Sequence, residues 1–244
     1  MSTSSAKPFR RPEDVYLKED RYEEPKEIFK FLGRIIADLE LPADAKVLDV
    51  GCATGELIYY LKRLNPGFRA LGIDPSGEMI AQAGQRVSGA EFAVGSLLDD
   101  DFFAERRFDL VVCSGVIPYF RDLKPPLYNL LAAAKRGGNV VVLNSVNEDP
   151  IDTHLLYRSA DAEDGPWLPD CTYSKRTYEK LLAQSGYELE TSWQRFRMPF
   201  ALPKQKDLIR AWTIATLDNP FQLTCGTLQL IDLQALVMRI VTEP

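Results

Sequence analysis

Apolar runs alternate with amphipathic stretches along residues 27–143. Apolar positions repeat at helical spacing from Glu27 to Leu39, which predicts a helix. Short continuous apolar runs, typical of strands buried on both faces, alternate after it with stretches of helical periodicity. The predicted strands span residues 46–50, 70–73, 91–94, 108–113 and 139–143, and the predicted intervening helices span 57–64, 78–87 and 127–134. This alternation predicts an α/β fold with a doubly wound, Rossmann-like parallel sheet.

The alternation stops after the fifth predicted strand. Residues 145–173 are polar and aromatic, and a connection of this length is usually functional, so we expect a lid on the substrate side. Further predicted elements are a helix at 174–185, a strand at 189–198, a helix at 204–217 and a long strand at 229–241. Because no crossover helix of ordinary length separates the last two strands, they are expected to pair antiparallel at one sheet edge. The prediction is a seven-stranded sheet, mostly parallel, with an antiparallel last strand and a small lid.

The same pattern gives the domain organisation. Residues 1–22 are polar and charged, which predicts a flexible N-terminal arm. Residues 23–244 are expected to form one domain, with substrate insertions at 145–173 and 199–227. The sequence leaves the oligomeric state open.

Charge and composition exclude several classes of protein. The chain has 244 residues with 29 Lys+Arg against 35 Asp+Glu, and this net charge of −6 disfavours nucleic acid as a partner. No stretch approaches the roughly 18 consecutive apolar residues of a membrane helix, and no signal peptide is visible, so we expect a cytoplasmic protein. The four cysteines are widely spaced and there is one histidine, which predicts reduced thiols and no metal site.

A turn of small residues follows the first predicted strand. Gly51, Ala53 and Gly55 stand at positions i, i+2 and i+4, where the chain must bend sharply and a ligand can approach the backbone. A dinucleotide-binding turn has glycines at i, i+2 and i+5. Glu56 occupies the i+5 position here, and its carboxylate would repel a pyrophosphate. The turn therefore favours a ligand without phosphates.

With Asp49 two positions before its first glycine, this turn resembles the glycine motif of class I S-adenosylmethionine (SAM) dependent methyltransferases, and the resemblance covers about residues 43–147. It implies that the backbone from Gly51 to Gly55 lies against the methionine part of SAM, with Asp49 near the amino group. Asp74, at the end of the second strand, can accept hydrogen bonds from both ribose hydroxyls. The remaining implied cofactor residues are Cys52, Ala53, Pro75, Met79, Ser96, Leu97, Ser114 and Gly115. Many members of the family carry an acidic residue at the position of Ser96.

Two residues are candidates for catalysis. A sulfonium methyl group is already activated, so the protein must align the acceptor and, for a hydroxyl or ammonium acceptor, remove a proton. His154 lies beyond the fifth strand and is a candidate base, with a packing role as the alternative. The resemblance places Tyr119 where various small-molecule methyltransferases carry a basic histidine. With a pKa near 10 a tyrosine is a poor base, so orienting the acceptor or packing is expected of it. Glu148, Asp149 and Asp152 are further carboxylate candidates in the lid.

The acceptor pocket is expected from aromatic and polar residues of the lid and tail. These are Tyr157, Trp167, Tyr173, Arg210 and Trp212, with Trp193 placed either there or in the core. Residues 207–213 and 228–241 loosely resemble methyltransferases of surface polysaccharide assembly, which implies a saccharide hydroxyl as acceptor. The leading hypothesis is transfer of a methyl group from SAM to an oxygen of a small molecule. The alternatives are a nicotinamide-dependent oxidoreductase, disfavoured by Glu56, a non-catalytic SAM-binding module, favoured by the lack of an unambiguous base, and an RNA methyltransferase, disfavoured by the acidic balance.

Overall fold

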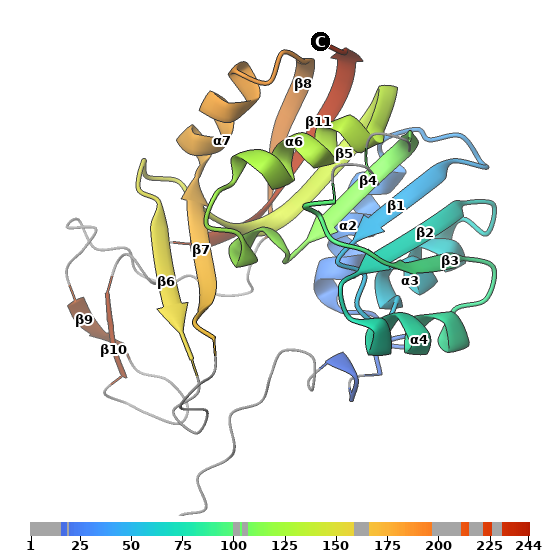
Figure 1. Ribbon diagram of the computed structural model, residues 1–244, viewed down its shortest axis with the longest axis horizontal. Helices are drawn as coiled ribbons and strands as arrows, with labels where there is room; N and C mark the ends of the chain where they lie inside the picture. The colour runs from blue at the N-terminus through green and yellow to red at the C-terminus, as the bar shows by residue number, and fades with distance from the viewer. Residues whose placement is uncertain are drawn as a thin grey trace, which may run out of the picture.

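Five parallel strands form most of the central sheet in the computed structural model (Figure 1). The structure describes residues 16–18, 20–99, 103, 107–158, 166–196, 211–214, 222–225 and 231–244. The five parallel strands are β1 (Lys46–Val50), β2 (Arg69–Asp74), β3 (Glu91–Val94), β4 (Phe108–Ser114) and β5 (Ala134–Asn147). Their order in the sheet is β3-β2-β1-β4-β5, and each neighbouring pair is parallel. The predicted parallel core of the sheet is confirmed.

The last strand runs in the opposite direction to its neighbours. β11 (Ile231–Thr242) lies between β5 and β8 (Glu188–Arg195) and is antiparallel to both. Leu236, for example, faces Val142 on one side and Trp193 on the other. The seven-strand order is therefore β3-β2-β1-β4-β5-β11-β8, which confirms the prediction of an antiparallel last strand.

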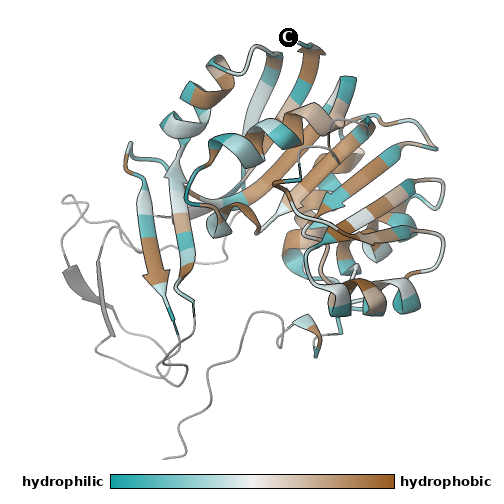
Figure 2. Ribbon diagram, viewed as in Figure 1, coloured by the Kyte–Doolittle hydropathy of each residue, from teal (hydrophilic) through white to brown (hydrophobic). Residues whose placement is uncertain are grey.

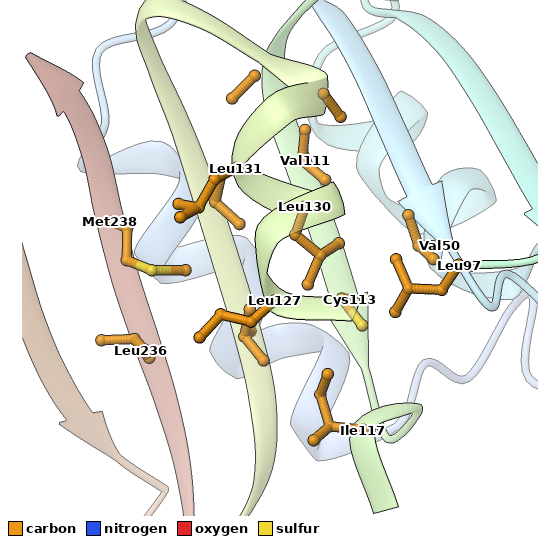
Figure 3. Close-up of a cluster of buried hydrophobic side chains, with 14 of the residues drawn as sticks. Val50, Leu97, Val111, Cys113, Ile117, Leu127, Leu130, Leu131, Leu236 and Met238 are labelled. Carbon is orange, nitrogen blue, oxygen red and sulfur yellow. The ribbon is translucent and has the colours of Figure 1, made fainter. Parts of the chain in front are cut away.

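Helices cover both faces of this sheet. The helices are α2 (Glu27–Ala37), α3 (Glu56–Leu64), α4 (Gly77–Arg86), α6 (Lys124–Ala133), α7 (Lys175–Ala183) and the short 3₁₀ helix η1 (Ile117–Tyr119). Successive strand side chains point to opposite faces, so Val111 and Cys113 pack under α6 and α7, whereas Leu110 and Val112 pack with α2 and α3. Figure 2 shows the apolar residues concentrated along the central strands, and Figure 3 shows the packing around Leu127, Leu130 and Leu131 of α6. Two apolar cores thus hold the sheet rigid on either side.

The predicted lid contains regular structure. β6 (Thr153–Tyr157) and β7 (Leu168–Ser174) form an antiparallel ribbon in which His154 faces Cys171. β7 also continues the main sheet, because Tyr173 and Ser174 pair in parallel with the end of β5. Figure 1 shows the ribbon extending beyond the end of β5. We expected a lid across 145–173 and no strands within it; the two strands satisfy their backbone polar groups by pairing with each other and with β5.

Two further boundaries differ from prediction. The helix expected at 204–217 is wrong at Ala211–Ile214, which forms strand β9 and pairs antiparallel with β10 (Gln222–Cys225). The β-propensity of Trp, Thr and Ile outweighs the helical spacing of the apolar residues there. The other residues of 204–217 lie outside the described part of the chain. β5 begins at Ala134 instead of residue 139, and its pairing with β4 is irregular around Gly137 and Gly138.

The described part of the N-terminal arm packs against the domain. Tyr22 is 5% exposed, its hydroxyl donates to the carbonyl oxygen of Thr54 at 2.7 Å, and its ring lies edge-on to Tyr59. The prediction of a flexible arm reaching to residue 22 was therefore wrong at its last residue. Tyr22 buries its ring and so holds this charged stretch against the domain. Residues 1–15 and 19 lie outside the description. Within the described residues, no helix has the length and apolar character needed to cross a membrane.

Candidate functional site

A cavity of about 380 Å³ lies at the carboxyl ends of β1, β2 and β4. Ligands of open α/β sheets bind at such strand ends, where the strand order changes direction. Many of the predicted cofactor residues line the cavity: Asp49, Gly51, Cys52, Ala53, Asp74, Pro75, Met79, Ser114 and Gly115. Its volume and its lining, largely apolar with a few converging carboxylates, suit a small organic ligand.

The small-residue turn has the conformation that its glycines require. Gly51 has a φ of 74°, and a Cβ built there would lie 2.2 Å from Cγ2 of Val116, so only glycine fits. The amides of Gly51 and Cys52 both donate to the carbonyl oxygen of Ile73, at 2.8 and 3.0 Å. These bonds fasten the turn after β1 to the end of β2. A ligand in the cavity can therefore contact backbone at this position.

Asp74 joins the turn to the beginning of α4. Its Oδ2 accepts the Ala53 amide at 3.0 Å and its Oδ1 accepts the Ser76 amide at 2.9 Å. Burial raises the pKa of the carboxyl, and the two amides oppose that shift. Each carboxylate oxygen has a further acceptor site, so both can also accept hydroxyl groups. The two acceptor oxygens of Asp74 therefore suit a vicinal diol such as a ribose. Ser76 accepts the Met79 amide and caps α4, as its position after Asp74 suggests.

Asp49 is a buried carboxylate in the cavity wall. It is 2% exposed, and burial together with the negative charge of Asp74 raises its pKa to about 7. A cation in the cavity would favour the ionised form of this carboxylate, because opposite charges attract strongly where little water is present. The ammonium group of an amino acid tail provides such a cation. With the Gly51 turn and Asp74, Asp49 therefore completes a set of residues that fits SAM.

Three predicted cofactor residues lie outside the cavity lining. Gly55 is the N-cap of α3 with a φ of 81°, and a Cβ there would meet the Phe92 ring at 3.0 Å, so this glycine serves close packing. Ser96 is exposed, and its hydroxyl accepts the Leu98 amide. Leu97 is buried in the core, and its carbonyl accepts a hydrogen bond from Asn129. Adenine contacts by Ser96 and Leu97 stay predictions.

The two predicted catalytic residues are placed differently. Tyr119 lines the cavity from η1, and burial is the main cause that raises its pKa to about 12. His154 is exposed on β6, and its ring lies edge-on to Tyr173 with centroids 5.5 Å apart. It is not part of the cavity lining. The structure thus brings Tyr119, but not His154, to the cofactor site.

The predicted acceptor residues do not form one pocket. Tyr173 is 4% exposed and donates to the carbonyl oxygen of Phe120, so its expected acceptor contact is replaced by a structural hydrogen bond. Trp167 is 56% exposed and stacks with Arg158, and Tyr157 lies outside the cavity lining. Arg210 is outside the described residues, and for Trp212 only the backbone of β9 is described. Leu168 of the ribbon does reach the cavity.

The other residues considered for chemistry are structural. Asp152 accepts the Ser174 amide and the Thr177 hydroxyl at the start of α7. Glu148 is hydrogen-bonded to the side chains of Arg195 and Gln234 and ion-paired with Lys175. Trp193 packs edge-on to buried Tyr178. The described residues contain no cluster of three or more His, Cys, Asp or Glu side chains that could hold a metal ion.

Sequence reasoning missed the contribution of the N-terminal segment to the site. Tyr16, Lys26 and Phe29 line the cavity from the segment before α2 and from its first turn. The available signal was the pair of tyrosines, Tyr16 and Tyr22, within an otherwise charged stretch. Spacing alone does not show that this stretch folds back onto the turn, as in the contact of Tyr22 with Thr54, 32 residues later.

Comparison with known proteins identifies the family. The sequence model of a family described as "Methyltransferase domain" matches residues 18–192. The chain belongs to this methyltransferase family, and SAM is the cofactor. Membership of this family argues against the alternative of a nicotinamide-dependent oxidoreductase.

Two curated relatives illustrate the range within the family. Trans-aconitate 2-methyltransferase of Variovorax paradoxus is 30% identical over 156 residues, which are 63% of this chain and 58% of that protein. Phosphoethanolamine N-methyltransferase 1 of Triticum aestivum is 26% identical over 206 residues, 76% of this chain and 41% of that protein. The chain spans about half the length of the curated relatives that it matches.

Solved structures agree on the fold. A methyltransferase in complex with the Haloferax volcanii Trm112 methyltransferase activator has a TM-score of 0.64 at 18% identity, covering 96% of this chain and all of that one. SAM-bound CalS10, an amino pentose methyltransferase from Micromonospora echinaspora, has a TM-score of 0.54 at 14% identity, covering 93% and 94% of the two chains. At these identities the likeness establishes the Rossmann-like architecture and no acceptor.

Proposed function

We propose that the protein transfers the methyl group of SAM to a carboxylate oxygen of a small molecule. The observation that carries this proposal is the state of Tyr119. Its side chain lines the cavity and is 45% exposed, and partial burial raises its pKa to about 12, so at neutral pH the hydroxyl is protonated and serves as a hydrogen-bond donor and not as a base. A carboxylate is already ionised and needs no base, whereas a hydroxyl or ammonium acceptor does.

The residues of the cavity have complementary roles in this proposal. SAM supplies a methyl group that its sulfonium sulfur has already activated. Asp74 accepts hydrogen bonds from the ribose hydroxyls, and Asp49 pairs with the ammonium of the methionine tail. The backbone of the Gly51 turn packs against that tail. Tyr119 donates to the acceptor oxygen and orients it, so alignment at short range provides most of the rate enhancement.

Other acceptors have weaker support. The name of the relative from Variovorax paradoxus refers to trans-aconitate, a carboxylic acid, which favours oxygen. The relative from Triticum aestivum is named an N-methyltransferase, so an amine is a reasonable second acceptor class. The saccharide suggested by the tail stays a prediction, because Arg210 lies outside the described residues and Trp212 is described only by its backbone. Small-molecule and cytoplasmic character are likewise part of the proposal.

Methyl transfer from labelled SAM tests the acceptor class. The protein would be incubated with di- and tricarboxylates, with sugars and with phosphoethanolamine, and the labelled products treated with mild alkali. We expect alkali-labile label, because methyl esters are hydrolysed under conditions that leave ethers and methylamines intact. Tyr119→Phe should lower kcat/KM about tenfold, the contribution of one hydrogen bond to a charged group, at unchanged SAM affinity. Alkali-stable label would show an ether or a methylamine product and would overturn the carboxylate as acceptor. No label in any product would favour a non-catalytic SAM-binding module.

A further inference from the structure

The ribbon of β6 and β7 has two different faces. Residues that pair directly across an antiparallel ribbon share a face, and neighbours along a strand point to opposite faces. The pairs Leu155–Asp170 and Tyr157–Leu168 therefore lie on one face. We call it the cavity face, because Leu168 lines the SAM cavity. Leu156 lies on the opposite face.

The cavity face is fixed beside the residue that we assign to the acceptor. Tyr119 and Leu168 line the same cavity, and η1 packs against β7. The Tyr173 hydroxyl of β7 donates at 2.8 Å to the carbonyl oxygen of Phe120, which directly follows η1. Burial is the main cause of the raised pKa of Tyr119, and electrostatic interactions with residues of the cavity face contribute to it. An acceptor held by Tyr119 would therefore extend along this face.

The cavity face is apolar, with one negative charge. Leu155 is 46% exposed, and Tyr157 and Leu168 are half-buried, so a ligand has apolar surface to cover. Removal of this surface from water favours a hydrocarbon chain or ring. Asp170, directly opposite Leu155, is exposed and would repel a second carboxylate of the acceptor. The face therefore favours an acid with one carboxylate over a di- or tricarboxylate.

The positive charges near the cavity already lie against other groups. The Arg158 guanidinium, directly after β6, stacks on the Trp167 ring at 4.9 Å from its centroid. In the described cavity lining, Lys26 is the one positively charged side chain, and its Nζ lies 3.8 Å from Oε2 of Glu56. A second carboxylate on the acceptor would have to compete with these contacts, whereas a hydrocarbon part would leave them intact.

We propose that the cavity face of the ribbon binds the apolar part of the methyl acceptor, which is a carboxylic acid with one carboxylate and a hydrocarbon chain or ring. The inference rests on the proposed function, in which Tyr119 orients the acceptor carboxylate. Transfer to the carboxylate oxygen forms the new oxygen–carbon bond as the carbon–sulfur bond breaks. The products are a neutral methyl ester and S-adenosylhomocysteine, so the acid loses its one negative charge.

Methyl transfer from labelled SAM to straight-chain monocarboxylates, from acetate to decanoate, tests the inference on the full chain. We expect kcat/KM for alkali-labile product to rise about two- to fourfold for each methylene that reaches the ribbon, the gain from burying one methylene. Adipate has the length of hexanoate and a second carboxylate. Its kcat/KM should be lower than that of hexanoate by about tenfold or more, because the second charge must lose water beside Asp170.

Two neighbouring leucines of β6 give a matched pair of variants. Leu155 and Leu156 are similarly exposed, at 46% and 42%, but lie on opposite faces of the ribbon. Leu155→Ser should lower kcat/KM about fivefold for octanoate and less than about twofold for acetate. Leu156→Ser should change neither value. Asp170→Asn should raise kcat/KM for adipate by about threefold or more and leave that for hexanoate nearly unchanged.

The outcomes separate an error in this inference from an error in the proposed function. Rates that do not depend on chain length, or an equal loss in Leu155→Ser and Leu156→Ser, would overturn the inference and leave carboxylate methylation in place. No alkali-labile product from any acid would overturn the carboxylate acceptor, and the inference with it. SAM affinity should be unchanged in all three variants, because none of the three residues lines the cavity. A loss of SAM affinity in Leu155→Ser as large as its loss of activity would also overturn the inference.

Discussion

Single carboxylates in this protein titrate according to what surrounds them. Asp49 is buried near a second carboxylate, and its pKa rises to about 7. Asp109 is also buried, which opposes its ionisation, but the Lys135 ammonium and the Lys46 amide outweigh burial and hold its pKa below the ordinary value. Asp49 therefore suits a site that receives a cation. Asp109 instead joins the amino ends of β1 and β4, on the side of the sheet away from the cavity.

The raised pKa of Asp49 should make the ligand-free protein less stable as pH rises. Between its ordinary value of 3.8 and about 7 the folded state holds a proton that the unfolded state has released, so the stabilisation present below pH 3.8 is lost as pH rises through 7. Asp49→Asn should remove this dependence and raise the free energy of unfolding by roughly 2–4 kcal/mol at pH 8, with little change near pH 4. Urea unfolding at several pH values measures it. Asp109→Asn should lower the free energy of unfolding at pH 8. Destabilisation by both variants would contradict the raised pKa of Asp49.

At the scale of elements, the site depends on how the ends of strands are tied to the following helices. The turn after β1 is hydrogen-bonded to the Ile73 carbonyl of β2. Asp74 connects that turn to α4 by accepting the Ala53 and Ser76 amides. The same carboxylate is expected to hold the ribose. Binding and local stability are thus coupled in one residue.

Asp74→Asn should therefore have two effects. An amide side chain has one acceptor oxygen, so one of the two backbone amides loses its partner, and we expect a loss of about 1–3 kcal/mol in unfolding free energy. SAM affinity should fall tenfold or more, because ribose contacts are lost as well. Thermal unfolding and calorimetric titration measure the two effects. Asp44→Asn, in an exposed pair with Arg69, is the control and should change neither; unchanged SAM affinity in Asp74→Asn would remove the ribose assignment.

At the scale of the whole molecule, one carboxylate connects three elements that lie beyond β5 in the sheet. Glu148 follows β5 and contacts Lys175 of α7, Arg195 of β8 and Gln234 of β11. Burial opposes its ionisation, but these three partners lower its pKa to about 2. The contact network connects elements that lie up to 86 residues apart in the sequence.

Glu148→Gln should weaken this part of the sheet in a pH-dependent way. Because the folded pKa lies below the ordinary value of 4.5, the stabilisation is complete above pH 4.5 and is lost as pH falls through 2. We expect a loss of about 1–2 kcal/mol at pH 7, since the pair is partly exposed, and a smaller loss near pH 2. Urea unfolding of the two proteins measures the difference. Glu190→Gln, in an exposed pair with Arg239, should cost much less, and a pH-independent cost at Glu148 would contradict the titration.

Periodicity and local motifs by themselves determined the strands β1 to β4, their parallel direction and the tight turn after β1, because a buried parallel strand and a tight glycine turn impose their residue types locally. The same motifs singled out Asp49, Gly51 and Asp74, which all line the cavity. The tertiary structure alone decided what depends on distant contacts: the ribbon of β6 and β7, the exposure of His154, the burial of Tyr173 and the arrival of Lys26 at the cavity. Side chains that meet through folding leave no spacing in the sequence, so only their packing and hydrogen bonds reveal them.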